Sequence, residues 1–386
     1  MPSLISYTDG NRITLLQNGA DFFPALEAAI DQACSHVYLE SYIYADDETG
    51  KRIGAALMRA AERGVATHLI IDGFGSQDYP ASALQALRAA GVDALIYRRQ
   101  ISPWRFRRQR LRRLHRKLAV IDDRIAFVGG INIINDAPAP GIPPQFDFSV
   151  AVEGPLVASV LREMRTLHAH MQRIRLRIPD IIATSPPPPA CGEMRAAFIQ
   201  RTNLKHRREI ERVYLRAIGR ARHEIILANS YFLPGRRFRN ALLQAAARGV
   251  PVKLLLQGRI EFRFVHYATR ALYDELLAAG IEIYEYQPSI LHAKVAVIDQ
   301  IWATVGSSNI DPTSLHFSRE ANVAVFDRDF ATDLHTHLQS AIDTASRRIL
   351  QSDLKRNKWW ERLLSRWAYS GVRMLAEVLG YGVEMK

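Results

Sequence analysis

Cysteine is nearly absent from this sequence, since Cys34 and Cys191 are the two in 386 residues. So few cysteines build no disulfide framework, and we expect a reducing compartment with both thiols inert. The N-terminus has no basic region followed by an apolar run, which argues against a signal peptide. No stretch reaches about 18 uninterrupted apolar residues, so no membrane-spanning helix is expected. Any contact with a bilayer then comes from one side.

Acidic residues are outnumbered: 39 Asp and Glu stand against 51 Lys and Arg, a net charge of +12. This balance favours an acidic partner, either nucleic acid, an anionic membrane surface or a phosphorylated substrate. Hydrophobic residues make up 48% and charged residues 23%, which excludes global disorder. The length suits two domains.

The chain repeats itself on the scale of a domain. Residues 36–73 and 223–258 each predict a strand, a loop, an amphipathic helix and a Gly-Val turn into a second apolar strand. In both halves a further helix, a glycine and a strand follow. Alternating strands and helices predict α/β layers in which helices cover a mostly buried sheet.

Four consecutive prolines at 186–189 can continue neither a helix nor a central strand. We therefore predict a first domain over residues 1–175, a Pro-rich linker over 176–195, a second domain over 196–350 and a tail over 351–386.

Two stretches combine basic and aromatic residues. Eight of the fourteen residues from Trp104 to Lys117 are Lys or Arg. The tail holds three of the five tryptophans next to a series of Lys and Arg side chains. Both are candidate contacts with an anionic membrane, through Trp104, Arg105, Arg107, Arg108, Trp359, Trp360 and Trp367. The tail is equally interpreted as a helix packed on the core.

The motif His-x-Lys-x-x-x-x-Asp occurs once in each half, as "HRKLAVID" from His115 and "HAKVAVID" from His292. Side chains two apart on a strand share a face, so each histidine projects with its lysine, Lys117 or Lys294. Matching places in a repeated unit can meet about a pseudo-two-fold axis. We therefore predict one pocket with two imidazoles and two ammonium groups.

This set of side chains suits phosphoryl transfer on a diester. One imidazole attacks phosphorus while the other protonates the leaving alcohol, and the lysines stabilise the non-bridging oxygens. Asn132 and Asn309 each lie 17 residues past their histidine, and with the Ser307 hydroxyl they are candidate donors to phosphate. Asp147 and Glu320 precede apolar strands and are candidates for orienting the histidines.

No metal or other cofactor is required, because lysine and histidine supply the positive charge. The pairs His168/His170 and His335/His337 lie in predicted helices, where a spacing of two diverges. We expect these four histidines at the surface. Asp122 and Asp299 lie an odd number of positions from their histidines, so a turn or ion-pair role is plausible for them.

The doubled motif, each copy followed by "GGIN" or "GSSN", resembles the two HKD motifs of the phospholipase D superfamily. Within it, "YLESYIYADDETGKRIGAAL", "FDFSVAVEGPLV" and "NSYFLPGRRFRNAL" resemble the bacterial cardiolipin synthases, particularly the shorter type B form. The resemblance implies two similar α/β/α sandwich domains about a pseudo-two-fold axis, with the active site at their interface. It also implies a catalytic set of His115, Lys117, Asp122, His292, Lys294 and Asp299.

The activity implied is phosphatidyl transfer between two phosphatidylglycerol molecules at the cytoplasmic face of the bacterial cell membrane, giving cardiolipin and glycerol. The resemblance assigns the nucleophile to His115 and the acid/base role to His292, and the pseudo-symmetry makes this reversible. Three alternatives stay open: a phospholipase D that uses water, a nuclease of the superfamily, and a binding module without activity. The oligomeric state is open, and nucleic acid is the less favoured partner.

Overall fold

The computed structural model describes residues 5–98, 113–137, 141–174, 186–202, 206, 208–260, 263–311, 318–356, 365 and 367–371. The first half comprises β1 (Thr8–Gln17), α1 (Asn18–Asp31), β2 (His36–Ser41), α2 (Glu48–Glu62), β3 (Ala66–Asp72), α3 (Ala81–Ala89), β4 (Asp93–Tyr97), β5 (Lys117–Ile121), β6 (Ile125–Gly129), β7 (Phe148–Glu153) and α4 (Val157–Ile174).

The second half repeats this order. It comprises β8 (Met194–Arg201), α5 (Glu209–Arg220), β9 (Ile225–Asn229), α6 (Arg236–Ala247), β10 (Val252–Gln257), α7 (Arg263–Arg270), α8 (Tyr273–Ala278), β11 (Glu282–Tyr286), β12 (Lys294–Ile298), β13 (Trp302–Gly306), β14 (Glu320–Phe326), α10 (Arg328–Ala345), β15 (Ser346–Ile349) and α11 (Gln351–Arg356).

The strands form one sheet with the order β15-β11-β10-β9-β12-β13-β14-β8-β1-β7-β6-β5-β2-β3-β4. Read outward from the central β8–β1 pair, each half has the same order, and β15 adds an edge strand to the second. Three strands in each half are parallel (β2, β3 and β4; β9, β10 and β11), and the others pair antiparallel. The two matching α/β units confirm the predicted fold class.

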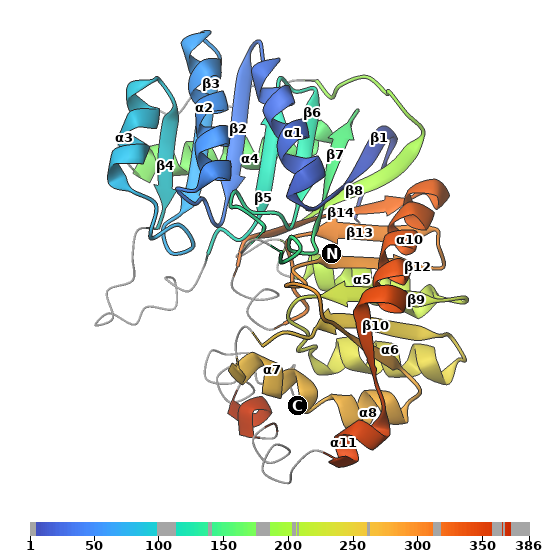
Figure 1. The fold of residues 1–386 in the computed structure, drawn as a ribbon. Coiled ribbons are helices and arrows are strands. Elements are labelled where there is room, and N and C mark those ends of the chain that lie inside the picture. The colour runs from blue at the N-terminus through green and yellow to red at the C-terminus, as the bar shows by residue number, and fades with distance from the viewer. Residues whose placement is uncertain are drawn as a thin grey trace.

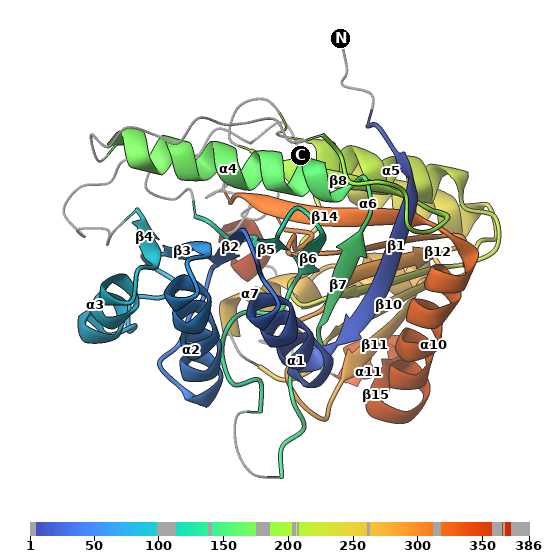
Figure 2. The same ribbon diagram turned by 90° about the horizontal axis from the view of Figure 1, so that it is seen from above.

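Helices cover both faces of each half. In the first half α1, α2 and α3 lie on one face and α4 on the other (Figure 2). The largest apolar core joins both halves, because α4, α10 and strands of both units contribute to it. Figure 1 shows the first half, in blue and green, next to the yellow and orange second half. The halves are therefore packed together rather than only tethered.

Local sequence explains where the elements begin. Asp47 caps α2 by accepting from the Gly50 amide at 2.9 Å, and Asp327 caps α10 in the same way from Phe330 at 2.9 Å. Strands β5 and β12 are buried at every position, as expected for strands covered on both faces.

The predicted limits of the domains stay a prediction. On either side of the predicted linker, α4 ends at Ile174 and β8 begins at Met194. No helix in the described ranges is long and apolar enough to cross a bilayer. Cys34 and Cys191 are both exposed free thiols.

Candidate active site

Both histidines of the doubled motif lie immediately before a central strand. Lys117 is the first residue of β5 and Lys294 the first residue of β12. The ammonium of Lys117 donates to the backbone carbonyl of His115 at 2.7 Å, and Lys294 donates in the same way to that of His292. Each lysine is therefore held against the backbone of its own histidine.

Backbone pairing crosses from one half to the other at these histidines. The His115 amide donates to the carbonyl of Arg319 at 3.0 Å, and the His292 amide donates to that of Phe146 at 2.9 Å. Leu114 forms an isolated parallel bridge with Arg319, and Phe146 forms one with Leu291. Each motif thus lies beside the segment that leads into β7 or β14 of the opposite half.

The carboxylate that contacts each histidine also comes from the opposite half. His115 Nδ1 lies 3.0 and 3.1 Å from the two carboxylate oxygens of Glu320, and His292 Nδ1 lies 2.6 Å from Asp147 Oδ2. A carboxylate at Nδ1 selects the tautomer that leaves Nε2 free to accept a proton or to attack. Each histidine is therefore prepared for chemistry by a residue of the other half.

Burial and neighbouring lysines keep both imidazoles neutral. Burial lowers the pKa of His292 to about 4, Lys294 lowers it further and Asp147 opposes the shift. Burial also lowers the pKa of His115; Glu320 opposes this, while Lys117 and Lys294 reinforce it. Because Lys294 acts on His115 and Lys117 acts on His292, the four side chains form one electrostatic unit, as predicted.

Lys117 occupies an unusual environment for an ammonium group. It is 5% exposed, and burial lowers its pKa to about 7, against the opposing effect of Glu320. Its Nζ lies 5.3 Å from the ring centre of Tyr42, and the Tyr42 ring lies 4.6 Å from that of His115. A phosphate anion bound here would stabilise the charged form.

The predicted phosphate donors have different surroundings. Asn132 Oδ1 accepts from the Ile43 amide at 3.1 Å. Asn309 Oδ1 is buried and has no hydrogen-bond partner among the described residues. Ser307, by contrast, donates to Glu320 Oε2 at 2.5 Å. In this structure Ser307 therefore supports the carboxylate of the His115 pair, and a contact with phosphate stays a prediction.

Asp122 and Asp299 lie at the opposite end of their strands from the lysines. Asp122 accepts from the backbone amides of residues 34–36 at 2.7–2.9 Å, and Asp299 accepts from those of residues 222–224 at 2.7–3.0 Å. Both have a positive φ, 53° and 55°, in the turn after the strand. Their place in the catalytic set is thus corrected: they fix the turn and the start of β2 or β9.

Sequence reasoning missed several residues that hold the site. The Leu114 amide donates to Asp72 Oδ2 at 2.9 Å, and the Leu291 amide donates to Gln257 Oε1 at 3.1 Å. Arg116, the last arginine of the basic run, is fully buried and bonds to Glu40 at 2.5 and 2.9 Å. One feature of the sequence indicates Asp72 and Gln257: they occupy matching places in the two halves, in "IIDG" and "LLQG".

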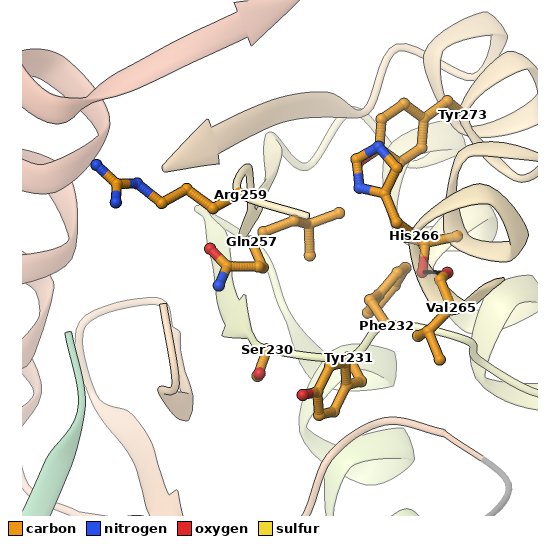
Figure 3. A pocket seen from close by; sticks show the side chains of 10 residues that line it. Ser230, Tyr231, Phe232, Gln257, Arg259, Val265, His266 and Tyr273 are labelled. Atoms are coloured by element: carbon orange, nitrogen blue, oxygen red, sulfur yellow. Dashed lines mark hydrogen bonds between the residues drawn. The ribbon is translucent and has the colours of Figure 1, made fainter. Parts of the chain in front are cut away.

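Figure 3 shows a small cavity in the second half, with a volume of about 30 Å³. Its lining residues include Ser230, Tyr231, Gln257 and His266. Gln257 joins the cavity to the motif, since its Oε1 accepts from the amide that precedes His292. Ser230 Oγ and Gln257 Nε2 are buried and have no partner among the described residues, so the cavity presents polar atoms that a small hydroxylated group can bind.

The membrane-contact candidates are mostly outside the described residues; this applies to Trp104, Arg105, Arg107, Arg108, Trp359 and Trp360. Trp367 is described and is 66% exposed. Its neighbour Ala368 is buried, and the Tyr369 hydroxyl accepts from Arg239 at 3.1 Å. The stretch 367–371 thus packs on the second half while presenting a tryptophan outward.

The expected surface position is wrong for two of the four paired histidines. His168 is buried and its Nε2 lies 2.8 Å from Asp93 Oδ2, while His335 Nε2 lies 2.8 Å from Glu224 Oε2. Both belong to helices whose inner face meets polar side chains at the start of a strand. His170 is exposed, as expected.

Comparison with known proteins shows the family of the chain. The family model "Cardiolipin synthase, PLD-like domain" matches twice, over residues 26–161 and 214–342. The chain belongs to this family. Cardiolipin synthase B of Salmonella typhi is 40% identical over 377 residues, covering 97% of this chain and 91% of that protein. Cardiolipin synthase A of Pseudomonas fluorescens is 31% identical, covering 92% of this chain and 73% of that protein.

The fold has counterparts among solved structures at low sequence identity. Phosphatidylserine synthase of Haemophilus influenzae superposes with a TM-score of 0.71 at 12% identity, covering 98% of this chain and 97% of that one. At this identity the likeness shows the fold alone. The family model and the relatives of 31–40% identity confirm the resemblance to the phospholipase D superfamily that the two motifs indicate.

Proposed function

We propose that this chain transfers the phosphatidyl group of one phosphatidylglycerol molecule to a second, forming cardiolipin and releasing glycerol. The observation that carries the proposal is the pair of crossed His–carboxylate contacts, with two lysines, in a member of the cardiolipin synthase family. Relatives of 31–40% identity bear the cardiolipin synthase name over most of this chain.

In the first step a neutral imidazole Nε2, assigned to His115, attacks phosphorus. A phosphorus–nitrogen bond forms, the bond to the glycerol oxygen breaks, and His292 delivers the proton that the departing glycerol needs. Lys117 and Lys294 stabilise the non-bridging oxygens as charge builds on them.

In the second step His292 removes a proton from a hydroxyl of the acceptor phosphatidylglycerol. That oxygen attacks phosphorus, the phosphorus–nitrogen bond breaks and His115 is restored. Water in place of the acceptor would give phosphatidic acid, so the acceptor has to exclude it.

The resting site holds both histidines neutral, whereas the first step needs a proton on His292. An anionic phosphodiester between the two lysines offsets the positive field that helps to lower the pKa of His292. Substrate binding therefore raises that pKa and favours the protonated acid. The pseudo-symmetry also permits His292 to attack and His115 to act as the acid. Trapping the covalent intermediate distinguishes these two assignments.

We propose that the protein acts at the cytoplasmic surface of the cell membrane, which it contacts from one side. The net charge of +12 attracts an anionic leaflet. Trp367, 66% exposed on a segment packed against the second half, is placed to contribute at the headgroup level.

Mass spectrometry of products from phosphatidylglycerol vesicles tests the proposal. We expect cardiolipin and glycerol from the wild-type protein and neither from His115→Ala or His292→Ala, while His170→Ala serves as an exposed-histidine control. Quenching with denaturant at alkaline pH, where a phosphorus–nitrogen bond survives, should trap the label of phosphate-labelled lipid on one histidine. Phosphatidic acid alone would establish a hydrolase instead, and cleavage of DNA without any lipid product would establish a nuclease.

A further inference from the structure

We propose that His68, Asp93 and His168 form a binding site for a divalent transition metal ion, separate from the crossed histidines. His68 lies near the start of β3, Asp93 begins β4 and His168 belongs to α4. Asp72, which holds the motif segment, lies at the other end of β3. The three ligands therefore stand at the end of the sheet away from the active site.

The three candidate ligand atoms already lie close together. Asp93 Oδ2 is 2.8 Å from His168 Nε2 and 3.7 Å from His68 Nδ1, and all three atoms lie within 4.8 Å of one another. A tetrahedral ion with bonds of about 2.0–2.2 Å separates its ligand atoms by roughly 3.4 Å. The 3.7 Å separation of Asp93 from His68 is already near that spacing, and the 2.8 Å contact with His168 has to open by about 0.6 Å.

The fold holds these side chains in place without an ion. His68 is the register partner of Asp93 on the next strand and of Tyr38 on the previous one. The Tyr38 ring stacks on the His68 ring at 4.5 Å, and Gln172 of α4 donates to Asp93 Oδ2 at 3.3 Å. Residues that fix the ligands from outside in this way are typical of metal sites in proteins.

The chemistry of the cluster suits a borderline cation. Two imidazoles and a carboxylate are the donor set that zinc, cobalt and related ions accept, with a fourth position left for water. His168 is 3% exposed, which limits competition from bulk water.

The second half shows what the same place looks like without such a donor set. Lys253 of β10 pairs with Glu282 of β11 as His68 pairs with Asp93. Its ammonium donates to Glu224 at 2.7 Å and to Gln339 at 2.9 Å. A protonated lysine has no lone pair for a metal, so the site is built into one half alone.

A bound ion would join β3, β4 and α4, which come from well-separated parts of the sequence. An ion that binds only the folded state stabilises it by mass action. Its expected effect is therefore on thermal stability and not on the transfer step.

The test uses the full chain without an affinity tag, stripped with a chelator and dialysed against micromolar Zn²⁺. We expect the wild-type protein to retain one more zinc per chain than His68→Gln, measured by elemental analysis, and to melt several degrees higher with zinc than without. His335→Gln changes the histidine of α10 that contacts Glu224 in the second half, and this variant should retain as much zinc as the wild type. Equal zinc in wild type and His68→Gln would overturn the proposal.

Cobalt provides a readout that does not depend on the stability of a variant. Co²⁺ bound by two imidazoles and a carboxylate should give the visible absorption of a four-coordinate ion, and Zn²⁺ should displace it. Asp93→Asn, which keeps the size of the side chain, should lose this band. A wild-type spectrum identical to that of aqueous Co²⁺ would also overturn the proposal.

Discussion

The two halves of the chain place His115 and His292 in the same way, yet they support them with different side chains. Each histidine precedes a buried strand, bonds through its carbonyl to its own lysine and contacts a carboxylate of the opposite half. Beside His115, however, stands a buried arginine, Arg116, where the second half has Ala293. The backbone positions that make the chemistry possible are shared, and the supporting residues differ.

The support around His115 is an ionic network. Arg116 bonds to Glu40 and, at 3.0 Å, to Glu163 of α4, which lies 3.4 Å from Arg319. Arg116 follows His115 in the sequence, and Arg319 precedes Glu320. The Glu163 carboxylate therefore contacts the sequence neighbours of both His115 and Glu320. Loss of one partner from a buried ion pair costs about 3–5 kcal/mol. The His115 side of the site is therefore the more rigidly supported.

The largest effect should come from breaking the crossed contacts. Glu320→Gln and Asp147→Asn each remove the charge that orients one imidazole, so we expect transfer to fall by about 10²–10⁴. Nitrogen NMR of labelled histidine should show a changed tautomer at His115 in Glu320→Gln alone and at His292 in Asp147→Asn alone. A change at the histidine of the same half would contradict the crossing.

Asp122→Asn is the matched control, because among the described residues the hydrogen bonds of this motif carboxylate go to the backbone of residues 34–36 and to the Ser35 hydroxyl. It should lower the free energy of unfolding by about 1 kcal/mol and leave transfer by the folded protein intact.

A smaller loss of activity, with a gain in stability, is expected for Lys117→Met. Transfer should fall by about 10²–10³ because one phosphate-stabilising charge is lost. The pKa of Lys117 falls from 10.5 to about 7 on folding, so below pH 7 the folded state carries a costly buried charge. Between pH 7 and 10.5 the unfolded chain binds more protons, and the wild type gains stability from this group as pH rises.

Melting curves of both proteins from pH 6 to pH 10 check this sign. The advantage of Lys117→Met should be greatest at the acidic end and should vanish near pH 10. An advantage that grows with pH would show that Lys117 stabilises the fold as a cation.

The smallest effect should follow from making the halves more alike with Ser307→Gly. The first half has Gly130 at this position, where a Cβ would overlap the carboxylate of Asp147. The Ser307 hydroxyl bonds to Glu320, and a hydrogen bond to a charged group contributes about 1.5–3 kcal/mol, so a loss of about ten- to a hundredfold is expected. Steady-state transfer assays measure it, with Ser308→Ala as control. An unchanged rate would show that Glu320 is held without the serine.

Sequence alone predicted the α/β halves, the His and Lys positions and the two carboxylates, because a duplicated pattern with strand periodicity carries that information. It did not predict which carboxylate meets which histidine, since the partners lie 205 and 145 residues apart and leave no local pattern. It also placed Arg116 in an exposed basic run, whereas Glu40 and Glu163 permit its burial. His168 and His335 were misplaced for the same reason, because their acidic partners come from distant strands.

The contacts of Glu320 with His115 and of Asp147 with His292 also have a consequence during synthesis of the protein. During synthesis the first half leaves the ribosome with its histidine and lysine complete but without the carboxylate at residue 320. Its imidazole then lacks the contact that fixes the tautomer in the folded protein, so we expect no transfer by the first half alone. The crossed contacts therefore make activity dependent on the packing of the last third of the chain onto the first.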